Sequence, residues 1–561
     1  MGLYRLLRKR LHTQYVTAAL ATTVFLISYA VLSGNGVSTQ RAVGMCLIYL
    51  FADVTGYASV SYTHLTLPAY DMLNALGIVV LVLLWENPFL LSYSGFVFSV
   101  MAVIAIGVGA NVLLEWEHSW KRRQQAGEEN IKKTFFSRQK EGILVSFAIQ
   151  LFTIPLVAYS YYEIPVYAML INLFVLAVVN GLLGLTVLGV IVGMVFLPAG
   201  SVLFAPCGWM LDSYRFLCEV SLKIPGAQRI TGKPAHMRIF WYYLGLGVFL
   251  LAIYACARRN EKHKDGRETA DLCVSRRKKR LQGIVFSCFI AFLLLFLLFP
   301  QKKSFEIDFL DVGQGDGIYL CTGGGTSMFI DGGSTDVKQV GKYRILPFLK
   351  AKGVSEISYW FVSHTDTDHV SGLKEVLVSG YRVEYLVFAK AVEKEAKTKE
   401  LAELARSHGT KVLYMQAGDT VRSKRAAMRC LYPKASDKAE DVNDLCLVLQ
   451  FEEGDIRALF GGDISTDVEE QLSRREKWDK VLVFKADHHG SRYANAEALL
   501  KCIRPEITVA SAGKDNRYGH PSPDAVQRIK ESGSRFFCTI EGGRIRVRVI
   551  ENKLVCETYV K

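Results

Sequence analysis

Several common site motifs are missing from this chain. Its 12 cysteines contain no Cys-x-x-Cys pair and no zinc-finger spacing, so a metal site made of cysteines is not expected. No Gly-Lys-Ser or Gly-Lys-Thr follows either of its two glycine-rich acidic segments, which excludes a nucleotide-binding P-loop there. No cleavable signal peptide is evident, because the basic stretch Arg5–Arg10 precedes an apolar run that looks like a retained membrane span.

Hydrophobic residues make up 50% of the 561 residues, but they are spread unevenly. Long apolar runs stop at Pro300, and after Lys302 short apolar runs alternate with charged turns, as in a soluble α/β domain. We therefore expect a membrane domain over residues 1–300 and a soluble domain over residues 304–561. The net charge of +14 has two compatible explanations: basic loops that set membrane topology, or attraction for a polyanion such as DNA.

The first domain is expected to be a polytopic helical bundle with about nine spans, since a spanning helix needs roughly 20 apolar residues. Cys207–Leu222 is more amphipathic and is expected to be interfacial or re-entrant. Ser59–Ala69 interrupts the hydrophobic pattern and resembles translated sequencing-adaptor DNA. The predicted spans are Tyr15–Leu32, Ala42–Tyr57, Met72–Trp85, Phe89–Leu114, Ile143–Tyr161, Val166–Leu182, Leu185–Val202, Ile239–Ala257 and Leu281–Leu298.

Three segments are strongly basic: the N-terminus, Lys121–Lys140 and Arg258–Arg280. Cytoplasmic loops are enriched in Lys and Arg, so all three are expected on the cytoplasmic side. An even number of predicted spans separates each basic segment from the next, so this assignment is self-consistent. One span then remains, which predicts that the soluble domain is extracytoplasmic.

Five of the 11 histidines fall in three short motifs after residue 300. The strongest is Ser363–His369 (SHTDTDH), which lies between an apolar strand-like run, Ile357–Val362, and a helix-like run from Leu373. His364, Asp366, Asp368 and His369 are therefore expected in one strand-to-helix loop. Imidazole and carboxylate groups at this spacing suit a divalent ion of the zinc or manganese type.

The later motifs supply further candidate ligands. Asp463 follows an apolar strand and two glycines, which predicts a bridging carboxylate, although Gly-Gly-Asp alone is only a turn signal. His488 and His489 end the next apolar strand, and a solvated histidine pair is the simpler alternative. His520, in Tyr-Gly-His-Pro, could lie over the substrate or be an ordinary turn histidine.

Two acidic segments rich in glycine precede these motifs. Asp331 ends a strand in Ile-Asp-Gly-Gly and is placed to orient a metal-ligating histidine through a hydrogen bond. Asp311 begins Asp-Val-Gly-Gln-Gly-Asp and is expected to hold that loop.

The soluble half resembles the metallo-β-lactamase superfamily, which implies an α/β fold of the αββα sandwich type. The order DVGQGD, IDGG, SHTDTDHVSGL, GGD, DHHGS and YGHP is similar to the C-terminal domain of the ComEC family of competence DNA-uptake channels. The membrane half agrees, because residues 34–42 (GNGVSTQRA), residues 94–99 (SGFVFS) and the Asn172 region resemble that family's competence domain.

The resemblance implies a channel that carries single-stranded DNA across the bacterial cytoplasmic membrane in natural transformation. It also implies a nuclease domain, competence proteins that deliver the DNA, and one or two zinc or manganese ions. Asp368 or Asp463 would orient the attacking water, His520 would assist the leaving oxygen, and Lys485, Arg492, Lys514 and Arg517 would hold the DNA backbone. The implied ligands are His364, Asp366, Asp368, His369, Asp463 and one or both of His488 and His489.

The chain departs from the family pattern at three places. Asp366 replaces the second histidine of the superfamily loop, no histidine stands between that loop and Asp463 as a middle ligand, and Cys446 stands where the family tends to have serine. An extra N-terminal domain, of OB type in relatives, is missing, which predicts a natural short form or a fragment. Two rival functions remain: a membrane-anchored hydrolase of a small ester, and a transporter whose metal site is inactive.

Overall fold

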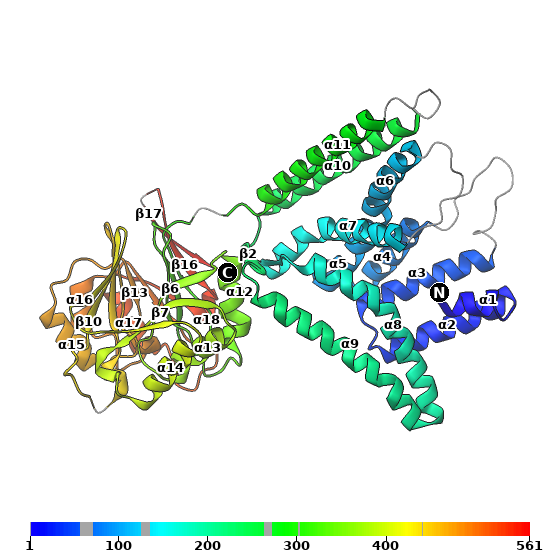
Figure 1. Ribbon diagram of the computed structural model, residues 1–561. Helices are drawn as coiled ribbons and strands as arrows, with labels where there is room; N and C mark the ends of the chain where they lie inside the picture. The colour runs from blue at the N-terminus through cyan, green and yellow to red at the C-terminus, as the bar shows by residue number, and fades with distance from the viewer. Residues whose placement is uncertain are drawn as a thin grey trace. The chain divides into compact units, whose positions relative to one another are not determined.

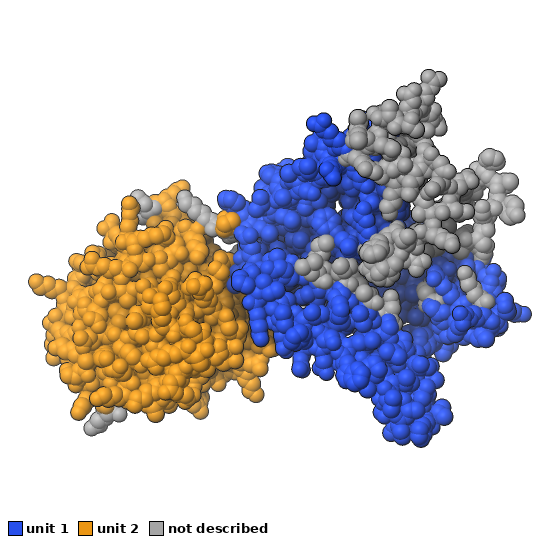
Figure 2. Space-filling model, viewed as in Figure 1, with its two compact units in different colours: residues 1–299 blue, residues 300–561 orange. Residues whose placement is uncertain are grey.

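The computed structural model describes residues 2–55, 71–124, 135–262, 272–300, 303–439, 441–551 and 553–560. The predicted insertion Ser59–Ala69 and the end of the second predicted span lie outside these residues. The chain forms two compact units, Met1–Phe299 and Pro300–Lys561, which are coloured separately in Figure 2.

Over its described residues, the first unit is helical apart from one short antiparallel pair of strands, β1 (Glu163–Pro165) and β2 (Gln228–Ile230) (Figure 1). Five of its described helices are long and apolar enough to cross a membrane: Tyr15–Leu32, Ser94–Trp120, Lys140–Tyr161, His236–Arg259 and Arg277–Leu297. Met72–Glu86 and Gly181–Val195 are shorter apolar helical segments. The helices are α1 (Gly2–Lys9), α2 (Tyr15–Leu32), α3 (Val37–Val54), α4 (Met72–Glu86), α5 (Ser94–Ile104), α6 (Asn111–Gln124), α7 (Phe135–Tyr161), α8 (Ala168–Val195), α9 (Leu197–Lys223), α10 (His236–Lys262) and α11 (Leu272–Leu297).

The sixth and seventh predicted spans have the wrong boundary. The chain does not break between Leu182 and Leu185 but continues as α8 to Val195, and it turns at Phe196, whose backbone is extended. Pro198 then occupies the first turn of α9, where a missing N–H costs nothing. Cys207–Leu222, expected to be interfacial or re-entrant, lies within the single helix α9.

Helices α8 and α9 lie side by side as a tight hairpin (Figure 1). Their backbones lie close together at Gly193 and Gly200, since a methyl group on Gly200 would lie 2.5 Å from the Gly193 Cα. Small residues at such a crossing let two helix backbones pack closely. Membrane helices associate through such close packing, because the hydrophobic effect gives no driving force between helices in lipid.

A buried carboxylate joins three helices of this unit. Glu117 of α6 is 5% exposed and lies 2.6 Å from Lys140 of α7 and 3.1 Å from Lys279 of α11. The segments that carry these two lysines are the second and third basic segments of the sequence. Within the unit, Lys140 and Lys279 therefore lie close together, each paired with the same carboxylate.

The second unit contains two mixed sheets. One has eight strands in the order β17-β16-β3-β4-β5-β6-β7-β8, and the other has seven in the order β15-β14-β13-β12-β11-β10-β9. The strands are β3 (Glu306–Phe309), β4 (Gly317–Cys321), β5 (Ser327–Asp331), β6 (Glu356–Phe361), β7 (Arg382–Ala389), β8 (Lys411–Met415), β9 (Thr420–Ser423), β10 (Ala426–Tyr432), β11 (Val448–Glu453), β12 (Ile456–Phe460), β13 (Val483–Lys485), β14 (Ile507–Ala510), β15 (Arg535–Cys538), β16 (Ile545–Ile550) and β17 (Lys553–Thr558).

Three hydrophobic layers show how these sheets are packed. One joins the inner faces of both sheets, for example Phe309, Phe361 and Phe460. A second joins the eight-stranded sheet to helices α12 (Leu346–Ala351), α13 (Thr367–Val378) and α14 (Ala396–Ser407). A third joins the seven-stranded sheet to α15 (Thr466–Arg475), α16 (Glu497–Ile503) and α17 (Pro523–Glu531). The domain is therefore an αββα sandwich, which confirms the predicted fold class.

Parallel strands bring the chemically interesting loops to one edge. β5, β6, β7 and β8 are parallel neighbours in one sheet, and β12, β13, β14 and β15 are parallel neighbours in the other. The loops that leave the carboxyl ends of parallel strands are the usual place for a site in such sheets. The loops after β5, β6, β12 and β13 carry the predicted acidic and histidine motifs.

Candidate metal centre

The predicted ligands come from loops of both sheets. Asp331 ends β5, and the SHTDTDH loop connects β6 to the first turn of α13. Asp463 follows β12 after two glycines, and His488 and His489 follow β13. The first glycine of Gly-Gly-Asp is required by packing, because a methyl group on Gly461 would lie 2.3 Å from the Asp487 carboxylate.

His369 is oriented from behind by Asp331. Its Nδ1 lies 3.0 Å from the Asp331 Oδ2, and the other oxygen of that carboxylate accepts hydrogen bonds from the backbone N–H and the hydroxyl of Ser363. Since the carboxylate binds Nδ1, the Nε2 atom faces the centre, 3.4 Å from the Asp463 Oδ2. Such a carboxylate fixes both the tautomer and the ring angle of a metal-binding histidine.

His489 is oriented in the same way by a backbone carbonyl. Its Nδ1 lies 2.9 Å from the Ser511 carbonyl oxygen, which can only accept, so Nδ1 carries the proton. Its Nε2 then faces the centre, 3.4 Å from the Asp463 Oδ2 and 3.6 Å from the Asp368 Oδ2. Asp463 therefore lies between the two imidazoles.

The backbone is strained at these positions. Asp331, His488 and His489 have positive φ angles of 58°, 48° and 53°. A residue with a side chain rarely adopts this region, and each case costs on the order of 1–3 kcal/mol, typically at functional sites. The strain marks these residues as held in place by their surroundings.

The donor atoms converge as a cation site requires. Ligand atoms of Asp316, His369, Asp463 and His489 all lie within 4.8 Å of one another, and all four residues are buried. Among the described residues, the Nε2 atoms of His369 and His489 are buried and have no hydrogen-bond partner. Buried polar atoms are rarely left unpaired, and two imidazole nitrogens with carboxylate oxygens suit a divalent transition metal. The residues therefore fit a divalent ion.

Charged neighbours shift the pKa values of His489 and Asp368. Burial lowers the pKa of His489, but the nearby carboxylates of Asp463 and Asp316 raise it more, to about 9. Burial raises the pKa of Asp368, but the nearby His489 and His369 lower it by more, to about 2.

Two predicted residues lie at the rim. The His488 side chain is 32% exposed and its Nε2 is 3.8 Å from the Asp463 Oδ2. The His520 ring centre lies 5.6 Å from that of His488 and 6.2 Å from that of His489. Burial and the nearby histidine charges lower the pKa of His520 to about 4, so it is neutral near pH 7.

His364 and Asp366 make other contacts. His364 is buried beside His369, with ring centres 4.0 Å apart, but its Nδ1 faces the Ser363 hydroxyl at 3.1 Å and the Cys446 Sγ at 3.4 Å. The Asp366 carboxylate is 48% exposed and lies 2.9 Å from the Lys397 Nζ. The structure thus brings together Asp368, His369, Asp463 and His489, and directs Asp366 away from them.

Sequence reasoning missed Asp316 and misplaced Lys485. Asp316 is the last residue of the DVGQGD loop and belongs to the cluster. The residue singled out from that loop was Asp311, whose carboxylate accepts a hydrogen bond from the Gly313 N–H and so holds the loop. Lys485 was expected to hold DNA at the surface, but it is 1% exposed and cannot contact a polymer. The only sequence signal for Asp316 is an acid between two glycines directly before a strand.

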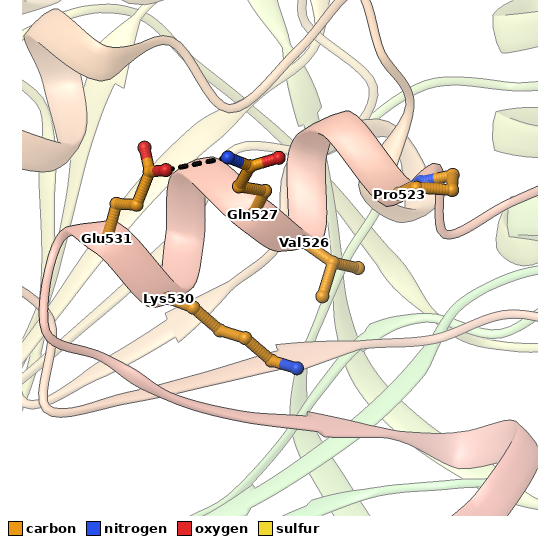
Figure 3. Close-up of a pocket in the computed structure, with 5 residues that line it drawn as sticks. All are labelled: Pro523, Val526, Gln527, Lys530 and Glu531. Atoms are coloured by element: carbon orange, nitrogen blue, oxygen red, sulfur yellow. Dashed lines mark hydrogen bonds between the residues drawn. The ribbon is translucent and has the colours of Figure 1, made fainter.

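A surface hollow on α17 lies outside this centre. Figure 3 shows that Pro523, Val526, Gln527, Lys530 and Glu531 line it from one helix, with Gln527 Nε2 donating to the Glu531 Oε1 at 2.8 Å. None of the predicted site residues lines this hollow, and its five lining residues all belong to one helix.

The comparisons with known proteins give the following matches. The family model described as Competence protein matches residues 1–255. ComE operon protein 3 of Bacillus subtilis is 24% identical over 549 residues, which is 95% of this chain and 64% of that protein. Recombination protein 2 of Haemophilus influenzae is 26% identical over 274 residues, 48% of this chain and 32% of that protein.

This chain therefore spans between about one third and two thirds of the length of these relatives. Among solved structures, the metallo-beta-lactamase fold protein YhfI from Bacillus subtilis is 12% identical and covers 43% of this chain and 99% of its own, with a TM-score of 0.30.

Proposed function

We propose that this chain, whose residues 1–255 match the family model described as Competence protein, takes up DNA during natural transformation and hydrolyses phosphodiester bonds with a divalent metal. Single-stranded DNA would pass the cytoplasmic membrane through residues 1–300, and residues 304–561 would form the nuclease. Competence proteins that deliver DNA would be its partners.

The buried cluster around Asp463 is the observation that carries the nuclease proposal. Two imidazoles aim unpartnered Nε2 atoms at one carboxylate, and each is oriented from behind, one by Asp331 and one by the Ser511 carbonyl. Asp368, His369, Asp463 and His489 would hold the ion, with His364 and His488 as further proposed ligands. A bound ion of this kind supplies a hydroxide near neutral pH and offsets charge on phosphoryl oxygens.

The surrounding side chains would provide the remaining functions. Asp368, which stays ionised, would accept a hydrogen bond from the attacking water and orient it. His520 is neutral and lies at the rim, so its ring N–H could donate to the leaving oxygen. Arg492, Lys514 and Arg517 would hold the phosphate backbone without reading bases. Lys485 has no such contact, because it is buried.

Five helices long and apolar enough to cross a membrane, together with the match to the competence family model, fit a membrane protein. We propose that it crosses the membrane several times and that the C-terminal domain is extracytoplasmic. This topology is supported by Glu117, which binds lysines from the second and third basic segments and so holds these two lysines close together. Those lysines would be cytoplasmic by the positive-inside rule.

Salt dependence separates DNA from a small ester as the substrate. The chain in detergent would be assayed with single-stranded DNA and with bis(p-nitrophenyl) phosphate between 50 and 200 mM salt. We expect DNA cleavage at subsaturating DNA to fall by on the order of 10-fold or more, since binding to phosphates releases counterions. Activity on the small ester with none on DNA would instead support the anchored hydrolase.

Metal binding should tighten as pH rises. The Nδ1 proton of His489 is held by the Ser511 carbonyl, so the proton lost near pH 9 sits on Nε2, where the ion would bind. Below that pKa, each displaced proton makes the affinity rise by about tenfold per pH unit. Competition with a fluorescent chelator from pH 6.5 to 9.5 would measure this, and an affinity independent of pH would contradict the assignment of His489.

Replacing Asp331 by asparagine should weaken metal binding without removing a ligand. The change removes the charge 3.0 Å from the His369 Nδ1, so the ring loses basicity and orientation. Such changes lower metal affinity by about 10–100-fold. The same chelator competition would test this, with Asp479→Asn as a control because Asp479 is exposed and pairs only with Arg457 among the described residues. Equal affinities in the two variants would contradict the role of Asp331.

A further inference from the structure

Lys485 is a buried cation within the candidate centre. It ends β13, is 1% exposed, and its Nζ lies 2.6 Å from the Asp316 Oδ2 and 3.1 Å from the Gly462 carbonyl oxygen. Lysine is almost never fully buried unless it is paired, because an isolated ammonium loses its hydration. The position of Lys485 is therefore set by the carboxylates it meets.

The same carboxylates belong to the metal cluster. Asp463 presents its Oδ2 to the Nε2 atoms of His369 and His489 at 3.4 Å, and its Oδ1 to the Lys485 Nζ at 3.6 Å. A carboxylate with a cation position on each oxygen is the arrangement of a bridging ligand between two ions. On the Oδ1 side, that position is already filled by an ammonium.

We propose that the Lys485 ammonium fills one of the two cation positions of this centre, which therefore binds a single divalent ion on the side of His369 and His489. This inference rests on the proposed metal-dependent function. Repulsion between an ammonium and a further divalent ion at the same carboxylate oxygen opposes a second ion, and low polarity in a buried site strengthens that repulsion.

The contacts of the other predicted ligands agree with a single ion. Asp366 pairs with Lys397 at 2.9 Å, and the Nδ1 of His364 faces Ser363 and Cys446. Lys485 instead provides the second positive charge from within the chain, and it would keep Asp316 and Asp463 in place when the ion leaves.

The test counts bound metal and needs no enzymatic activity. The full chain in detergent would be stripped with a chelator, loaded with Mn²⁺, desalted, and analysed for manganese and protein. We expect one ion per chain for the unaltered protein and for Lys485→Arg, which keeps the charge. Lys485→Met leaves both carboxylates without the ammonium, so it should bind a second ion. Lys374→Met is the matched control, because Lys374 is exposed and pairs with Glu400.

Each result decides between the two proposals. Two ions in the unaltered chain would overturn this inference and leave the metal-dependent function standing. No ion in the unaltered, folded chain would overturn both. One ion in a folded Lys485→Met would also overturn the inference, because the ammonium would then not be what excludes the second ion. If Lys485→Met does not fold, Lys485→Gln, which also removes the charge, is read by the same two outcomes.

Discussion

Replacing Asp463 by asparagine should lower metal-dependent DNA cleavage by more than about 100-fold, the upper range seen when residues behind a ligand are altered. Asp463 lies between the two imidazole Nε2 atoms and also faces the Lys485 ammonium. The amide keeps the shape of the side chain but removes the charge that binds the ion. Initial rates on end-labelled single-stranded DNA with Mn²⁺ would measure the effect.

Asp467→Asn provides the control for this variant. Asp467 lies four residues along the chain, in the first turn of α15, and is exposed. Its replacement should leave the cleavage rate within about twofold, since surface changes away from a site are usually nearly neutral. If Asp463→Asn cleaved DNA as fast as Asp467→Asn, Asp463 would not be a ligand.

Gly333→Ala should have the largest effect on the stability of the second unit. A methyl group there would lie 2.4 Å from the Asp368 carbonyl carbon and 2.5 Å from the His369 backbone nitrogen. These neighbours are backbone atoms, so the whole SHTDTDH loop would have to move. Forcing extra volume into a packed region costs typically 1–3 kcal/mol and occasionally more, so we expect about 3 kcal/mol and weaker metal binding.

Thermal unfolding in detergent would measure this, because about 3 kcal/mol corresponds to roughly 6–12 °C for a unit of this size. Gly380→Ala is the comparison. Its φ of +76° strains an alanine, but the methyl group would meet nothing within 4 Å. That variant should lose only about 1–2 kcal/mol. Equal shifts in the two variants would show that the contact between Gly333 and the metal loop is unimportant.

Periodicity and motif order were sufficient to predict the fold. Short apolar strands that end in acids, glycines and histidines predicted an α/β domain, and the αββα sandwich confirms it. The break between α8 and α9 could not be located in the same way. The predicted boundary lay between Leu182 and Leu185, but the helix continues until Phe196 and Pro198.

The site was predictable only where its residues lie close together in the chain. The SHTDTDH and DHHGS loops could be recognised in the sequence because each contains several potential metal ligands close together. Asp316 and Lys485 did not, because they are 169 residues apart and their 2.6 Å contact exists only after two different sheets pack together. A lysine at the end of an apolar strand gives no sign in sequence of whether it points to solvent or inward.

The central claim is that this chain cleaves DNA with a divalent metal. Its most direct test is cleavage of end-labelled single- and double-stranded DNA by the chain in detergent, with Mn²⁺ or Zn²⁺ or with a chelator, beside Asp368→Ala. The account predicts cleavage that requires the metal and is lost in the variant. A folded chain that cleaves neither DNA with any metal would contradict it.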